Sequence, residues 1–233
     1  MQDQIPEDSR TLVDATPARR PERVALDGRF VSLVPLGPEH AAALYEGSHG
    51  PGAGSLWAWM GDGPYGSANA FAEGIAAKAA SADPFWAVLD AASRRPLGYL
   101  SLMRIEPAHR VIEVGNILYT PALQRTPGAT EAVFLIASHV FERLGYRRLE
   151  WKCNALNAPS RRAALRFGFA FEGIFRQHMI IKGRNRDTAW YAMMDHDWTA
   201  RRAAFRQWLA EDNFGPGGVQ KVSLADLNGV AAG

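Results

Sequence analysis

Residues 113–132 read EVGNILYTPALQRTPGATEA, and this stretch decides the fold of the 233-residue chain. Alternating apolar residues predict a strand over 109–120, broken at Gly115, which runs through a polar loop into a helix over 129–144. Another strand is predicted over 147–154. A strand, a helix and a second strand in this order place the two strands parallel to each other in one sheet.

The surrounding elements give the rest of the architecture. Short links between the strands at 85–90, 97–105 and 109–120 predict antiparallel neighbours. The remaining predicted elements are strands at 30–36, 170–182 and 188–195, a hairpin turn at 183–187, and helices at 38–48, 69–82, 160–167 and 199–211. The sequence therefore predicts a mixed, mostly antiparallel α/β sheet flanked by helices.

Composition limits the class of protein. Hydrophobic residues make up 47% and charged residues 21%, and the formal net charge of +2 is too small to call for nucleic acid as a partner. Because Cys153 is the only cysteine, an intrachain disulfide and a four-cysteine zinc site are excluded. No signal sequence or membrane span is evident, so we expect a cytoplasmic protein without a membrane partner.

The sequence divides into three regions. Residues 1–22 contain several prolines and are predicted to form a mobile or loosely packed arm. Residues 23–212 are predicted to form one domain, and 213–233 a Gly-rich C-terminal tail.

The loop before the helix at 129–144 is a candidate anion site. The first N–H groups of a helix have no partner inside it, and the helix dipole favours negative charge there. The loop contributes polar, cationic or conformationally permissive residues: Gln124, Arg125, Thr126, Gly128 and Thr130. An ordinary strand-to-helix turn with a polar start has the same pattern, so this feature alone does not decide the function.

Two further motifs favour one family. Gln124-Arg-Thr-Pro127-Gly-Ala129 resembles the pyrophosphate-binding Q/R-x-x-G-x-G/A motif of the GNAT superfamily of acyl-CoA N-acyltransferases, with Pro127 where a glycine is usual. Asn157-Ala-Pro-Ser160, followed by Gly168-Phe169, resembles the N-x-x-S…G-F signature of the branch that contains the ribosomal-protein N-terminal acetyltransferases. The resemblance covers residues 28–198.

The resemblance implies an acyl-CoA-dependent enzyme that moves an acetyl group from acetyl-CoA to a primary amine by direct attack in a ternary complex. The amine would belong to a small molecule, an amino acid derivative or a peptide N-terminus. The implied fold has a splayed strand pair that holds the acyl-CoA, and no metal is implied. The implied cofactor-binding residues are Leu118, Thr120, Gln124, Arg125, Thr126, Gly128, Ala129, Thr130 and Asn157.

Two glutamates compete for the role of catalytic base. Glu113 matches the family's strand glutamate, and on alternation it shares a face with Gly115, Ile117 and Tyr119. A salt-bridged or surface carboxylate is the other interpretation. Glu150 shares a strand face with Lys152, so a charge pair between them is the simpler reading, with a role at the acceptor as the alternative.

Asn157 and Ser160 also have two interpretations each. Both residue types favour helix N-termini, so they could cap the helix that follows. The resemblance instead implies that Asn157 contacts the CoA arm and that Ser160 gives a proton to the leaving thiolate.

The binding site of the acceptor amine is the part of the active site that the sequence indicates least clearly. Trp57, Trp59 and Tyr65 lie in a Gly-rich stretch where the family places much of the acceptor wall, and aromatic rings would suit an apolar or cationic amine. Rings that merely cover the sheet are an equal alternative. Arg184 and Arg186 are expected to be solvated, with a smaller chance of touching an acidic acceptor or the CoA 3′-phosphate.

Two other functions compete with catalysis. A non-catalytic acyl-CoA-binding regulatory module would keep the fold without turnover, and Pro127 favours it slightly. Nucleic-acid binding through paired arginines ranks last, because no aromatic and basic sheet motif accompanies them. A homodimer is possible.

Overall fold

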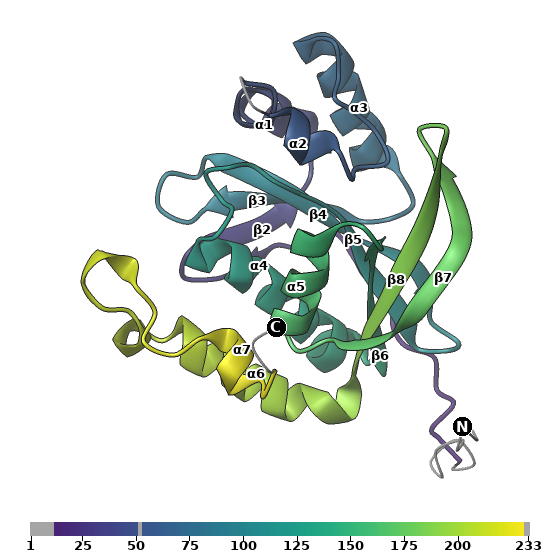
Figure 1. The fold of residues 1–233 in the computed structure, drawn as a ribbon, viewed down its shortest axis with the longest axis vertical. Helices are drawn as coiled ribbons and strands as arrows, with labels where there is room; N and C mark the ends of the chain where they lie inside the picture. Colours follow the sequence, from purple (N-terminus) through teal and green to yellow (C-terminus); the bar gives the residue numbers. More distant parts are fainter. Residues whose placement is uncertain (1–11, 51–52, 231–233) are drawn as a thin grey trace.

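A computed structural model describes residues 12–50 and 53–230, and an eight-stranded sheet runs through its centre (Figure 1). Its order is β1-β2-β3-β4-β5-β6-β8-β7. In that order the strands span Leu26–Asp27, Val31–Pro35, Phe85–Asp90, Pro96–Glu106, Val111–Tyr119, Arg148–Asn154, Arg184–Met194 and Ala170–Ile181. All neighbours pair antiparallel except β5 and β6, which are parallel. The predicted fold class is confirmed.

The parallel pairing of β5 with β6 is short. Its register contains three pairs, and Glu113 opposite Glu150 is the last of them. Beyond that pair β5 continues to Tyr119 along β4, and β6 continues to Asn154 along β8. The two strands therefore separate toward their carboxyl ends, which gives the splayed pair that the family resemblance implies.

A bulge interrupts β5 next to Gly115. The register shifts because Ser101 pairs with Gly115 while Tyr99 pairs with Leu118, so β5 has one residue more than β4 over this interval. Asn116 takes up the bulge with a φ of +50°. Alternation is reset there: Ile112, Val114, Ile117 and Tyr119 all belong to the larger core cluster. The prediction that Glu113 shares a face with Ile117 and Tyr119 is wrong for this reason.

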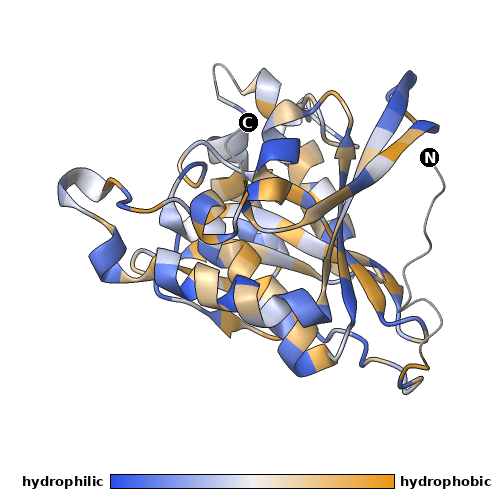
Figure 2. Ribbon diagram, turned by 60° about the horizontal axis from the view of Figure 1, so that its bottom comes forward, coloured by the Kyte–Doolittle hydropathy of each residue, from blue (hydrophilic) through white to orange (hydrophobic). Residues whose placement is uncertain are grey.

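Helices cover both faces of the sheet (Figure 1). A smaller apolar cluster includes residues of the helices that follow β2, and a larger cluster includes residues of the helices that follow β5. Figure 2 shows apolar residues concentrated at the centre of the molecule and polar residues at the tip of the β7–β8 hairpin. The α-helices are α1 (Ala41–Ser48), α2 (Gly54–Trp57), α3 (Ala68–Ala80), α4 (Pro127–Ser138), α5 (Ala158–Arg166), α6 (Asp195–Leu209) and α7 (Leu224–Leu227).

Local chemistry fixes the start and end of α4. Thr126 caps it by accepting a hydrogen bond from the Ala129 N–H, and Pro127 occupies the first helical position. The helix continues as a π-helical segment, His139–Leu144, and ends at Gly145 with a φ of +78°. The buried Glu131 carboxylate accepts three backbone N–H groups, those of residues 29–31, at 2.6–2.9 Å. This contact ties α4 to the turn before β2.

Two chain segments differ from the sequence-based picture. The hairpin between β7 and β8 turns on Lys182 and Gly183, both at positive φ, so residues 184–187 already belong to β8 rather than to the predicted turn. In the C-terminal segment, Leu224 is fully buried in the larger cluster. Asn213, Leu224 and Asn228 are the buried anchors of this segment, whereas residues 216–222 are exposed.

Candidate active site

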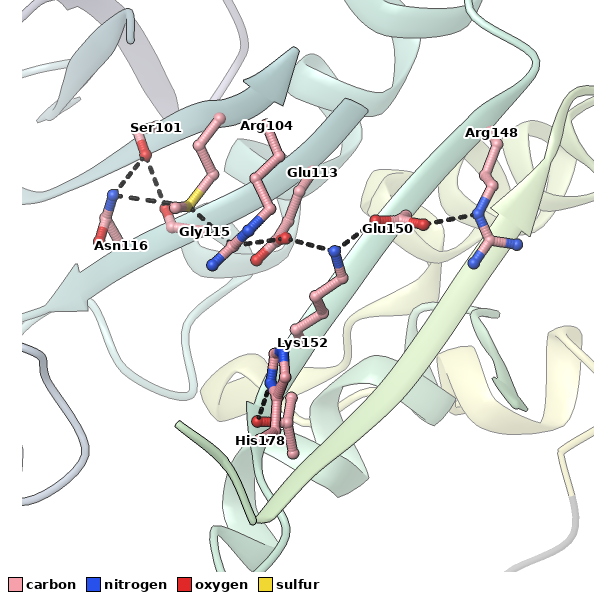
Figure 3. A network of polar contacts seen from close by, with 11 residues as sticks. Ser101, Arg104, Glu113, Gly115, Asn116, Arg148, Glu150, Lys152 and His178 are labelled. Atoms are coloured by element: carbon pink, nitrogen blue, oxygen red, sulfur yellow. Dashed lines mark hydrogen bonds and ion pairs between the residues drawn. The ribbon is translucent and has the colours of Figure 1, made fainter. Parts of the chain in front are cut away.

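A buried chain of charges lies where β5 and β6 begin to separate (Figure 3). The Lys152 Nζ is 3.0 Å from Glu113 Oε2 and 2.6 Å from Glu150 Oε2. The three side chains are at most 9% exposed. Arg104 Nη1 lies 2.7 Å from the same Glu113 oxygen, and Arg148 Nε lies 2.7 Å from Glu150 Oε1. Charges of opposite sign thus alternate, which compensates the cost of burying them.

The two glutamates differ in how fully they are held. Both oxygens of Glu150 are engaged, one by Lys152 and one by Arg148. Glu113 uses Oε2 for both of its cations, and no described residue donates a hydrogen bond to its Oε1. A Cβ added at Gly115 would lie 3.5 Å from that oxygen, so Oε1 faces the stretch of β5 beside the splay. Glu113 therefore keeps one acceptor oxygen available.

The pKa of Glu150 reflects its partners. Burial alone would raise this pKa, but hydrogen bonds and attraction from Lys152 and Arg148 hold it below its ordinary value. Glu150 is therefore ionised at neutral pH. The predicted charge pair between Glu150 and Lys152 is present, and the same lysine also pairs with Glu113.

Side chains of the loop before α4 are partly used inside the loop. Gln124 donates to the Tyr119 carbonyl at 2.8 Å, and Thr126 donates to the Leu123 carbonyl while capping α4. Thr130 accepts from Arg166 at 3.0 Å. Arg125 is exposed, has a φ of +62°, and forms no side-chain hydrogen bond or ion pair with the residues described. It is the loop cation available to an anionic ligand.

Glycine is required at position 128 by close packing. An added Cβ there would lie 2.7 Å from Val31 Cγ1, closer than real Cβ contacts allow. Gly128 therefore lets the first turn of α4 approach β2, and Ala129 follows with its N–H on the Thr126 hydroxyl. Pro127, in the usual glycine position of the motif, is accommodated at the start of the helix.

Backbone groups at the end of β5 divide between two sides. The Thr120 N–H and hydroxyl both donate to the Leu97 carbonyl, so Thr120 is bonded to β4. By alternation the backbone groups of Leu118 also face β4, and those of Ile117 and Tyr119 face the splay, where the Tyr119 carbonyl accepts from Gln124. The side chain of Leu118 is buried in the smaller cluster.

The start of α5 places Asn157 and Ser160 differently. Asn157 caps α5 because its Oδ1 accepts the Ser160 N–H at 3.1 Å. The Ser160 hydroxyl oxygen instead accepts the Trp151 indole N–H at 3.0 Å. An indole can only donate, so Trp151 does not use the hydroxyl proton of Ser160. Cys153 is buried beside it; burial raises the pKa of the thiol, and Ser160 partly offsets this.

The aromatic residues expected at the acceptor separate into buried and exposed ones. Trp57 is 1% exposed, and with Tyr65, His49 and Phe71 it forms a ring cluster over the sheet. Tyr65 donates to Asp62, which also pairs with Lys78 of α3. Trp59 is 41% exposed and is free to contact a ligand.

Several residues of this face are absent from the sequence-based site. Arg104 and Lys152 contact Glu113 directly. The Lys152 Nζ also lies 3.8 Å from the centre of the Trp190 ring, and Trp190 stacks against Phe175 at 4.4 Å. These contacts cross from β6 to β8 and β7, so strand register was needed to find them. Among the described residues, no three His, Cys, Asp or Glu side chains gather as metal ligands would.

This geometry can be compared with known proteins. A protein-family model described as the acetyltransferase (GNAT) domain matches residues 31–170. The chain belongs to the GNAT family of acetyltransferases. A GCN5-related N-acetyltransferase from Brucella melitensis is 45% identical to this GNAT protein, with a TM-score of 0.90 over 92% of this chain and 98% of that chain.

Two further relatives are less similar to this chain. The uncharacterized N-acetyltransferase YoaA of Bacillus subtilis is 28% identical over 109 residues, 47% of this chain and 61% of YoaA, so the match spans less than two thirds of that relative. The ribosomal α-N-protein acetyltransferase RimL has the same fold, at 19% identity and a TM-score of 0.63 over 73% of this chain and 94% of that chain. In the described part of this GNAT protein, no helix is both long and apolar enough to cross a bilayer.

Proposed function

We propose that this GNAT protein is an acyl-CoA-dependent N-acetyltransferase that acetylates a primary amine by direct attack in a ternary complex. The observation that carries the proposal is the separation of β5 from β6 directly after Glu113 and Glu150. An extended ligand can lie in that opening, and members of this family normally use acetyl-CoA.

The residues at the opening fit acetyl-CoA. Ile117 and Tyr119 present backbone groups that can pair with its pantetheine amides, and Arg125 is an unpaired cation beside the first turn of α4, where a pyrophosphate would be attracted. Thr126, which caps α4, and Thr130, which accepts from Arg166, then maintain the shape of the loop. When bound, acetyl-CoA supplies an activated thioester.

Glu113 is the proposed base. Its Oε1 is free to accept a proton from the amine, directly or through water, while Arg104 and Lys152 fix the carboxylate through Oε2. Glu150, with both oxygens engaged, holds Lys152 in place. Ser160 is the proposed donor to the departing thiolate, because its proton is not used by Trp151.

The acceptor lies, in this proposal, on the face of the sheet that carries Glu113, between the exposed Trp59 and the β7–β8 hairpin. The hairpin reaches that region, since Lys182 at its turn donates to the Trp57 carbonyl at 3.1 Å. Trp57, which is buried, and Tyr65, which donates to Asp62, support this region without facing the solvent directly in the case of Trp57.

Ligand-induced thermal stabilisation tests the cofactor site. Millimolar CoA or acetyl-CoA should raise the melting temperature, because a ligand that binds only the folded state stabilises it. Arg125→Met should reduce this shift. Arg94→Met is the matched control, since Arg94 is also exposed with positive φ but lies in the β3–β4 turn. No shift for the unmodified protein would contradict the assignment.

Turnover separates an enzyme from a regulatory acyl-CoA-binding module. Thiol release from acetyl-CoA should accelerate when suitable amines, amino acids or short peptides are added. A clear thermal shift without thiol release across the panel would favour the non-catalytic module.

A further inference from the structure

Arg186 of β8 is a cation without a partner. The side chain is partly buried, and its Nε is fully enclosed without a hydrogen-bond acceptor among the described residues. None of the described carboxylates pairs with its guanidinium. By contrast, Arg104 and Arg148 each contact a glutamate, and Arg166 donates to Thr130.

The environment makes this cation costly. Burial lowers the pKa of Arg186, and Cys153 and Glu113 only partly oppose that effect. An arginine nevertheless stays charged at neutral pH. Burying a charge or a donor without a partner opposes folding, so such a group beside a candidate active site points to a ligand.

Arg186 lies on the face of the sheet that carries the proposed base. Residues 186, 188 and 190 alternate onto one face of β8. Thr188 there contacts His178, and Trp190 covers Lys152, the ion-pair partner of Glu113. The charges of Glu113 and Arg104 are both close enough to influence Arg186.

A second donor on this face is also unsatisfied. The Trp190 indole Nε1 is buried, and no residue in the described ranges accepts its hydrogen bond. Both unsatisfied groups can only donate. A ligand that satisfies them must therefore bring acceptor atoms, which a plain alkyl ammonium lacks.

We propose that the acceptor is a primary amine that also carries a carboxylate, and that Arg186 binds this carboxylate while the amine faces Glu113. The inference rests on the proposed function and names its substrate class. The fork of an arginine matches a carboxylate bidentately. Glu113 and Glu150 are already paired with cations, so Arg186 remains available to an acidic substrate.

Acetyl-CoA is the less suitable partner for this arginine. Its pyrophosphate is expected at the start of α4, where Arg125 is available, and α4 packs with the larger cluster. Arg186 lies on the other face, where the charge of Glu113 acts on it. A carboxylate could come from a free amino acid or from an acidic side chain near a peptide N-terminus, and the experiment distinguishes these sources.

Steady-state thiol-release assays with matched acceptors test the proposal. The first probes are phenylalanine, phenylalaninamide and 2-phenylethylamine, with corresponding sets for other amino acids. The second are the peptides Ala-Asp-amide and Ala-Asn-amide. The acceptors with a carboxylate should have the higher kcat/KM in the unmodified protein, and the better of the two sets identifies the source.

Variants then assign the preference to Arg186. Arg186→Met should raise the acceptor KM about 10- to 100-fold for carboxylate acceptors, as expected for a lost charged hydrogen bond, and leave the KM for acetyl-CoA unchanged. Arg186→Lys should give an intermediate loss. Arg184→Met, which removes an exposed arginine two residues away on β8, should behave as the unmodified protein.

Three outcomes would overturn the inference. Equal kcat/KM for acids and neutral amines would remove the need for a carboxylate site. An unchanged acceptor KM in Arg186→Met would remove the residue from it, and a raised KM for acetyl-CoA alone would assign Arg186 to the cofactor. An absence of thiol release with every acceptor refutes the proposed function itself, and with it this inference.

Discussion

Glu113 and Glu150 share Lys152, yet their oxygens are used differently. Glu150 binds one cation with each oxygen, whereas Glu113 binds two cations with Oε2 and leaves Oε1 without a described donor. Its partners hold the pKa of Glu150 below its ordinary value, so that carboxylate stays ionised. Only Glu113 retains a site for a transferred proton.

The two glutamates can be compared with matched substitutions. Glu113→Gln should lower turnover by about 10²- to 10⁴-fold, because the amide cannot accept the proton. Glu150→Gln should lower it much less, since Lys152 and Glu113 remain paired. Each variant removes one of the two carboxylates around Lys152, so each controls for the structural effect of the other.

Kinetics and binding on the same variants decide the roles. The thermal shift with CoA should be similar for both, since neither glutamate faces the α4 loop. If Glu150→Gln were inactive and Glu113→Gln fully active, the proposed base would be the wrong glutamate.

At the scale of single residues, the sequence predicted part of this site. Glu113, Ser160 and the loop residues carry family motifs, and alternation placed Glu150 beside Lys152. Arg104 and Trp190 could not be predicted, because their contacts depend on which strands are neighbours. Arg186 was expected to be solvated, and only packing shows that its Nε is enclosed.

At the scale of elements, the start of α5 separates a cap from a catalyst. Asn157→Ala should cost about 1 kcal/mol of stability, because the Ser160 N–H loses its acceptor. If Asn157 also contacts the CoA arm, the KM for acetyl-CoA should rise. Ser160→Ala should lower turnover with little change in that KM, and it should lower the melting temperature only through the lost acceptor of the Trp151 indole N–H.

Melting temperatures and steady-state kinetics on these two variants provide the test. Reduced stability with normal kinetics in both variants would mean that Asn157 and Ser160 have structural roles only. Another residue would then have to be the proton donor.

The helices and strands could be predicted closely from the sequence, but the irregularities within them could not. Gly145 is a local signal that correctly ended the helix after β5, whereas the helix begins at Pro127, two residues before the predicted start at 129. The expected break at Gly115 is a bulge at Asn116, where a non-glycine residue takes positive φ. The Asn116 side chain donates to the Ser101 hydroxyl of β4 at 3.0 Å. The position of the bulge therefore depends on a contact with the neighbouring strand.

For the whole molecule, buried ion pairs predict the response to acid. Burial alone would raise the pKa values of Glu150 and Asp62, but their cationic and hydrogen-bonding partners hold both below the ordinary 4.5 and 3.8. A carboxylate with a lowered folded-state pKa contributes stability that is fully present above its unfolded pKa. That contribution is lost as the pH falls through the folded-state pKa.

Urea unfolding between pH 7 and pH 3 measures this effect. The unfolding free energy should be steady near neutrality and fall below about pH 4.5. Glu150→Gln should be less stable at pH 7 and should lose less on acidification. Glu73→Gln, an exposed position on α3 without a side-chain bond to described residues, should follow the unmodified protein. An identical acid response in Glu150→Gln would exclude this pair as a contributor.

The overall architecture was predictable because period and link length determine strand direction. The packing of the C-terminal segment was not, because its anchors are isolated. Leu224 enters the larger cluster, Trp208 donates to Gln220, and Arg201 donates to the Asn228 carbonyl. These contacts involve isolated residues that follow no helical or strand periodicity. The Gly-rich composition of the segment therefore gives no indication of them.

The brief pairing of β5 with β6 divides the backbone hydrogen bonding of the sheet into two parts. Strands β1–β5 form one continuous ladder, and β6, β8 and β7 form another, while three residue pairs join them. Each half keeps its own backbone hydrogen bonds if this seam opens, while the larger core cluster and the Glu113–Lys152 ion pair hold the halves together across it. A ligand that extends along β5 would fasten the seam, and hydrogen exchange in the two halves would then become coupled.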